Sequence, residues 1–199
     1  MKTVVRAAAR SLKQQVTVLG SSVTAVWAGF GAQVVTANAV VAWGIQPRTK
    51  QGLWGILFAP FLHGSPQHLL ANTVPLLVLG WLIMLRDAKH FIPVTLLAML
   101  GSGLFAWTFG ASGSVHIGAS GVVFGYLGFL IFAGWFARSL GAIALSILVT
   151  VLWGGLVFGV LPGQPGISWE SHLGGFVGGA LAAKWLAPRH AGASALRLR

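Results

Sequence analysis

The chain has 199 residues, of which 56% are hydrophobic and only 8% are charged. Soluble domains carry about 25% charged residues, so this composition excludes a water-soluble fold and places the apolar excess against lipid. The formal net charge of +11 does not indicate a nucleic-acid partner, because the Lys and Arg residues are scattered between long apolar runs and form no basic patch. Without Cys, the chain has no disulfide and no cysteine nucleophile.

The apolar runs predict one all-α integral membrane domain over residues 16–187, a bundle of six transmembrane helices. A basic cytoplasmic segment (1–15) precedes it and a short basic cytoplasmic tail (188–199) follows. Each run is near the 20 residues that cross a hydrocarbon core about 30 Å thick. The predicted spans are 16–43, 67–86, 91–109, 117–137, 139–160 and 170–187. The connector at 44–67 has too many Gly and Pro residues for a span, so we expect it in the membrane interface or part-way into the bilayer.

The distribution of basic residues predicts the orientation of this bundle. With the N-terminus inside, eleven Lys and Arg residues fall on inner segments and only Arg48 and Lys50 on outer ones. Cytoplasmic loops carry an excess of Lys and Arg. We therefore expect a multi-pass protein of the cell (inner or plasma) membrane with both termini in the cytoplasm.

Polar residues at the starts of three spans are predicted to converge. The second, fourth and sixth spans all run from outside to inside, and they begin near His68 and Asn72, near Ser120 and near His172 respectively. Polar side chains in spans usually face the bundle interior, where they pair or take part in chemistry. These residues are therefore expected at similar depth in the outer leaflet, as an active site requires.

Each of these residues also has a structural interpretation. A Ser in a transmembrane helix usually bonds to the preceding turn, and a lone His usually bonds to another helix. Here Gly118 and Gly121 flank Ser120 in HIGASGVVFG, and Gly175 and Gly179 follow His172 in SHLGGFVGG. Stripes of small residues allow two helix backbones to approach closely, which would bring the imidazole within reach of the hydroxyl.

His68 and Asn72 are four residues apart and share one helix face. They are either a mutually satisfied polar pair or two donors aimed at developing negative charge, as in an oxyanion hole. Glu170 suits the positive end of a helix dipole, and a triad role is disfavoured because residues two apart do not face each other. The six His residues form no HExxH motif or carboxylate cluster, so we expect no metal and no cofactor.

Three strings together resemble the rhomboid family of intramembrane serine proteases: HGSPQHLLANT (His63, His68, Asn72), HIGASGVVFG (Gly118, Ser120, Gly121) and HLGGFVGG (His172, Gly175, Gly179). They stand in the family's order on the second, fourth and sixth spans. The resemblance implies six core helices, a catalytic Ser120–His172 dyad and oxyanion donors from His68, Asn72 and the Ser120 backbone. Two features depart from the family's pattern. Phe124 stands where some members have Tyr, and the connector after the first span contains Trp54 but no obvious Trp-Arg pair.

The resemblance predicts a serine endopeptidase that cleaves transmembrane protein substrates in or near their membrane span, through an acyl-enzyme. Its site would face the extracytoplasmic side, with the Gly/Pro-rich segment 161–167 as a mobile cap. The alternative is a rhomboid-like pseudoprotease that binds transmembrane helices without cutting them.

Overall fold

The computed structural model describes residues 2–188, and nearly all of that range is helical. Seven α-helices follow one another in the described chain: α1 (Lys2–Val35), α2 (Lys50–Phe58), α3 (Pro66–Arg86), α4 (Phe91–Phe109), α5 (Ser120–Ala137), α6 (Leu140–Trp153) and α7 (Trp169–Trp185). Four short 3₁₀ helices join them: η1 (Ala39–Trp43), η2 (Ala59–Phe61), η3 (Ala88–His90) and η4 (Gly154–Val160). Over residues 2–188 there is no β-strand, only one isolated bridge between Ile45 and His116.

Several of these helices are long and apolar enough to cross a bilayer. Five segments meet both conditions within the described chain: Ala8–Val35, Pro66–Arg86, Ala88–Phe109, Ser120–Ala137 and Leu140–Val160. The chain is therefore a multi-pass membrane protein. The glycine-rich α7, with 17 residues, occupies the position of the sixth predicted span.

The observed helices differ from the predicted ranges mainly at their ends. The basic segment 1–15 is not a separate element: α1 runs from Lys2 through it, because its Ala, Arg, Lys and Leu residues favour a helix. That helix ends at Val35, and the rest of the expected span (to residue 43) is a turn followed by η1. The fourth span begins at Ser120, since residues 117–119 belong to the preceding loop. The predicted tail (188–199) lies, after Pro188, outside the described residues.

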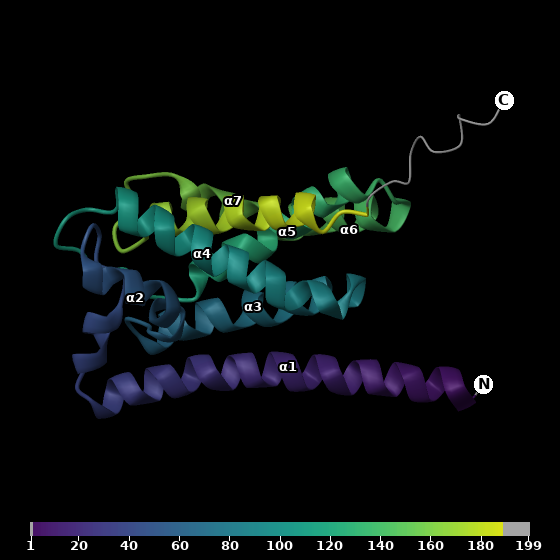
Figure 1. The fold of residues 1–199 in the computed structure, drawn as a ribbon, viewed down its shortest axis with the longest axis horizontal. Helices are drawn as coiled ribbons and strands as arrows, with labels where there is room; N and C mark the ends of the chain where they lie inside the picture. The colour runs from purple at the N-terminus through teal and green to yellow at the C-terminus, as the bar shows by residue number, and fades with distance from the viewer. Residues whose placement is uncertain (1, 189–199) are drawn as a thin grey trace.

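Helix α5 is the centre of the molecule. Its side chains Tyr126, Leu127, Phe129 and Leu130 are at most 1% exposed. Helices α3, α4, α6 and α7 all pack against it, whereas α1 lies at the edge of the bundle beside α3 (Figure 1). The core therefore fixes α5 more firmly than any other element, and Ser120 is its first residue.

Glycines allow α5 and α7 to touch through their backbones. A Cβ at Gly175 would collide with the carbonyl oxygen of Gly121, and one at Gly179 with that of Gly125. This close approach brings the start of α5 beside the start of α7, which holds His172.

The connector between α1 and α3 is fastened to the loop that leads into α5. Ile45 and His116 exchange two backbone hydrogen bonds of 2.9 Å. The Arg48 guanidinium donates to the carbonyls of Thr108 and Gly110, both at 2.8 Å, and to Ser112 Oγ at 2.7 Å. These contacts lie at the end of the bundle opposite the start of α1 (Figure 1).

Candidate active site

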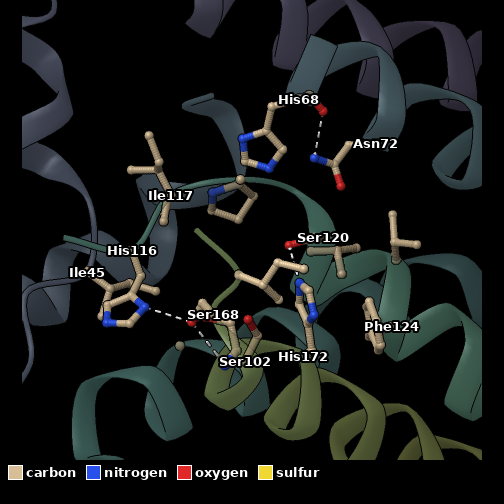
Figure 2. Close-up of a pocket in the computed structure, with 18 of the residues that line it drawn as sticks. Ile45, His68, Asn72, Ser102, His116, Ile117, Ser120, Phe124, Ser168 and His172 are labelled. Atoms are coloured by element: carbon tan, nitrogen blue, oxygen red, sulfur yellow. Dashed lines mark hydrogen bonds between the residues drawn. The ribbon is translucent and has the colours of Figure 1, made fainter. Parts of the chain in front are cut away.

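Ser120 and His172 form a hydrogen bond between the first turns of α5 and α7. The distance from Ser120 Oγ to His172 Nε2 is 2.8 Å. Figure 2 shows the imidazole rising from α7 toward the hydroxyl, with the Phe124 ring beside it. This is the arrangement of an alcohol and a base that can accept its proton.

Two further contacts orient the imidazole. His172 Nδ1 lies 2.9 Å from the carbonyl oxygen of Gly159 in η4. Because a carbonyl can only accept, Nδ1 carries the proton and Nε2 presents its lone pair to Ser120. The Phe124 ring stacks on one face of the imidazole, with the ring centroids 4.0 Å apart and an angle of 10° between the ring planes. The ring is therefore held in the tautomer and orientation that a general base needs, without a carboxylate.

A cavity of about 560 Å³ opens beside this pair, and His68, Asn72, Gly118 and Phe124 also line it. His68 and Asn72 both come from the first turns of α3 and lie on the far side of Ser120 from His172 (Figure 2). One N–H of the Asn72 amide donates to the His68 carbonyl at 3.0 Å, so the amide has a second N–H to offer. The cavity thus has the Ser120 hydroxyl on one wall and the polar side chains of His68 and Asn72 on another.

Gly118 keeps the space between these walls open. A Cβ at this residue would lie 2.9 Å from His68 Nε2 and 3.8 Å from Ser120 Oγ. Its φ of +121° is also unfavourable for any other residue. A side chain here would fill the gap between His68 and Ser120.

The backbone before Ser120 is fixed from the side of the connector. Gly118 N–H donates to the Ala59 carbonyl at 2.8 Å, and Ala119 N–H donates to His63 Nε2 at 3.3 Å. In the first turn of α5 the Val122 N–H donates to the Ala119 carbonyl at 3.0 Å, whereas the Ser120 N–H, at the first helical position, has no helical carbonyl to bond to. The Ser120 N–H is thereby available to an acceptor in the cavity, at the positive end of the helix dipole.

A buried contact that the sequence did not predict joins α1 to the segment before α3. The Gln33 side-chain amide donates to the His63 carbonyl at 2.7 Å and accepts from the His63 N–H at 3.1 Å. His63 is fully buried, and burial together with the neighbouring His68 lowers its pKa to about 4, so the ring is neutral. Gln33 could have been noticed as a polar residue inside an apolar run. Its partner could not have been predicted, because it is a backbone group, which every residue has.

The remaining predicted residues lie around the site and not in the cavity. Gly121, Gly175 and Gly179 lie where α5 meets α4 and α7, and a side chain at any of them would collide with a neighbouring helix. The Glu170 carboxylate is buried and lies 3.3 Å from Ser168 Oγ, not against His172. The cluster around Ser120 therefore consists of His172, His68, Asn72, Phe124 and Gly118.

Several known proteins are similar to this chain over much of its length. A family model described as the rhomboid domain matches residues 50–189. An uncharacterized protein of Mycobacterium tuberculosis is 43% identical over 162 residues, which are 77% of this chain and 68% of that protein. RHOMBOID-like protein 4 of Arabidopsis thaliana is 35% identical over 134 residues, 64% of this chain and 32% of that protein. The rhomboid protease GluP of Bacillus subtilis is 31% identical over 186 residues, 90% of this chain and 33% of that protein.

The matched region contains the helices that carry the polar residues of this cavity. It runs from the first residue of α2 to beyond the end of α7, and so includes His68 and Asn72, Ser120 and His172. Because the family model covers more than half of the chain, this protein belongs to the rhomboid family.

Proposed function

We propose that the protein is an intramembrane serine endopeptidase that hydrolyses a peptide bond in or near the transmembrane segment of other membrane proteins. The observation that carries the proposal is the 2.8 Å contact between Ser120 Oγ and His172 Nε2 at the wall of an open cavity. Family membership adds support, since one relative is named a rhomboid protease.

The reaction needs one proton carrier and one nucleophile. His172 Nε2 accepts the Ser120 proton as Oγ attacks the scissile carbonyl carbon, and a tetrahedral oxyanion forms. The imidazolium then gives this proton to the leaving amine, the C–N bond breaks and an acyl-enzyme remains. A water molecule, deprotonated by the same imidazole, attacks the ester and releases the acid and the free hydroxyl. Base catalysis of this kind contributes about 10²–10⁴-fold to the rate.

The oxyanion would be stabilised by the Ser120 N–H and by the side chains of His68 and Asn72. All three belong to residues that line the same cavity. Preorganised donors aimed at developing charge are worth about 10²–10³-fold each in kcat. The open space at Gly118, between His68 and Ser120, fits the path of a substrate carbonyl.

The site is proposed to face the extracytoplasmic side of the cell membrane. The cavity is lined by residues at the starts of α3, α5 and α7. These helix starts lie at the same end of the bundle as α2, which begins at Lys50 and follows Arg48, and away from the basic start of α1 (Figure 1). The exposed segment 161–167 lies next to the cavity, where Gly166 and Ile167 are wall residues, and serves as the cap through which substrate and water enter.

The test combines cleavage with covalent labelling. The purified protein in detergent is given a membrane-anchored fusion substrate and, separately, a fluorophosphonate probe. We expect Ser120→Ala and His172→Ala to abolish both cleavage and labelling. The matched control is Ser22→Ala, which removes a hydroxyl that bonds only to its own helix in α1 and should leave both signals unchanged.

Binding without cleavage would identify the pseudoprotease instead. If the protein retains a transmembrane substrate on a column but the probe does not label Ser120, the protease proposal is wrong. Full activity in Ser120→Ala would equally exclude this serine as the nucleophile.

A further inference from the structure

A second hydrogen-bonded pair lies parallel to Ser120 and His172. His116 is four residues before Ser120, and Ser168 is four residues before His172. His116 Nδ1 and Ser168 Oγ are 2.7 Å apart, close to the 2.8 Å of the Ser120–His172 pair. Two hydrogen bonds therefore join this part of the chain to α7 and its N-cap: one from the loop before α5, at His116, and one from the first residue of α5, at Ser120 (Figure 2).

The His116–Ser168 bond is compatible with either charge state of His116. Ser114 Oγ donates to the Ala111 carbonyl at 2.6 Å, so it accepts from His116 Nε2–H at 2.8 Å. In the neutral ring, Nδ1 then accepts from the Ser168 hydroxyl. In the charged ring, Nδ1–H donates to Ser168 Oγ, whose own proton then turns to Ser171 Oγ at 2.9 Å or to Glu170 Oε2 at 3.3 Å. The His116–Ser168 bond is kept in both states with its direction reversed.

Each end of this pair is anchored to the rest of the molecule. The backbone of His116 is bridged to Ile45 in the connector. Ser168 is the N-cap of α7, where its side chain accepts the Ser171 N–H. Among the described residues, His116–Ser168 is the only side-chain hydrogen bond between the loop before α5 and the start of α7. Without it, the Ser120–His172 bond itself would be the only side-chain hydrogen bond left at this place.

We propose that His116 and Ser168 are positioning residues that hold Ser120 and His172 at reacting distance. The inference rests on the proposed protease function. Both residues line the same cavity as Ser120 and His172, but the proposal has them act through the two chain segments that carry the reacting groups and not on the substrate. Because a misplacement of about 1 Å can cost 10²-fold in rate, a bond that fixes the separation of these segments affects kcat more than substrate binding.

The experiment is a double-mutant cycle on the full-length protein with the fusion substrate. His116→Phe keeps a ring but removes both hydrogen bonds, and Ser168→Ala removes the partner hydroxyl. We expect each to lower kcat by about 10- to 100-fold with KM changed less than about twofold. The kcat of the double variant should be about equal to that of the less active single variant, because both substitutions remove the same bond.

Two further variants separate positioning from helix capping. Ser168→Thr keeps a hydroxyl and should recover most of kcat. Ser139→Ala removes the matching N-cap of α6, where the side chain accepts the Ala142 N–H, and should leave kcat unchanged while costing similar stability. Thermal unfolding of every variant is measured alongside.

The possible failures are distinguishable. A wild-type protein whose Ser120 is not labelled by the fluorophosphonate probe would end the proposed function. A wild-type protein that cleaves, together with a Ser168→Ala variant of unchanged kcat, would overturn only the positioning role. Losses in kcat that add in the double variant, or that Ser168→Thr does not restore, would overturn it as well.

Discussion

The imidazole of His172 is oriented by a peptide carbonyl and an aromatic ring. Nδ1 faces Gly159 O at 2.9 Å and the ring lies flat against Phe124. A carbonyl fixes the tautomer as a carboxylate would, but it carries no full negative charge to stabilise the imidazolium. The geometry of the proposed base therefore depends on where η4 places the backbone of residue 159.

Gly159 is the residue at which this dependence can be tested. A Cβ there would lie 2.8 Å from Phe124 Cζ and 3.2 Å from His172 Nδ1, so Gly159→Ala must displace the ring stack or the carbonyl. We expect kcat to fall at least about tenfold, since proton transfer requires hydrogen-bond geometry. The matched control is Gly155→Ala in the same 3₁₀ helix, where a Cβ meets nothing within 4 Å. Equal activities of the two variants would show that η4 does not position the base.

Between elements, the decisive contact is the one between α5 and α7. It depends on backbone packing, because Gly175 and Gly179 each face a carbonyl of α5. In lipid, helix association relies on close packing and not on the exclusion of water. A methyl group at this contact therefore separates the two helices that carry Ser120 and His172.

Gly179→Ala is expected to destabilise the protein although alanine is the better helix former. The new Cβ would collide with the Gly125 carbonyl and lie 2.8 Å from Phe129 N. Overpacking costs about 1–3 kcal/mol, more than the gain of about 1 kcal/mol from helix propensity. Gly141→Ala in α6 is the control, because its Cβ would meet nothing within 4 Å and only the propensity gain remains. Thermal unfolding in detergent measures both; a midpoint for Gly179→Ala at or above that of Gly141→Ala would contradict the packing argument.

For the whole molecule, hydropathy predicted α3, α4, α5 and α7 within three residues, because charges, Gly and Pro bound each apolar run. The predicted span 139–160 differs in its last seven residues, which form the 3₁₀ helix η4 after α6 ends at Trp153. It could not predict that α1 begins at Lys2, since a polar helix leaves no hydropathy signal. Ser120, His172, His68 and Asn72 stood out as polar residues within spans. The Gly159 carbonyl and the Gln33 contact did not, because packing selects backbone partners that have no sequence signature.

The distribution of basic residues predicts how the bundle is oriented in the membrane. Basic residues gather at the end of the bundle where α1 begins and α3 ends, and this asymmetry favours a cytoplasmic location for that end. The chain contains no Cys, so a single introduced thiol reports its own side without background. Ala111, in the loop after α4, and Lys89, in η3 before α4, are both exposed and lie at opposite ends of this helix.

A membrane-impermeant maleimide on intact cells should therefore label Ala111→Cys and leave Lys89→Cys unlabelled until the cells are lysed. Lysed cells give the matched control, because both thiols must then react to similar extent. The reverse pattern in intact cells would place the cavity on the cytoplasmic side. Ser120 lies at the same end of the bundle as Ala111. That result would therefore also move the proposed cleavage to the inner leaflet, so that the substrate's transmembrane segment would be cut near its cytoplasmic end.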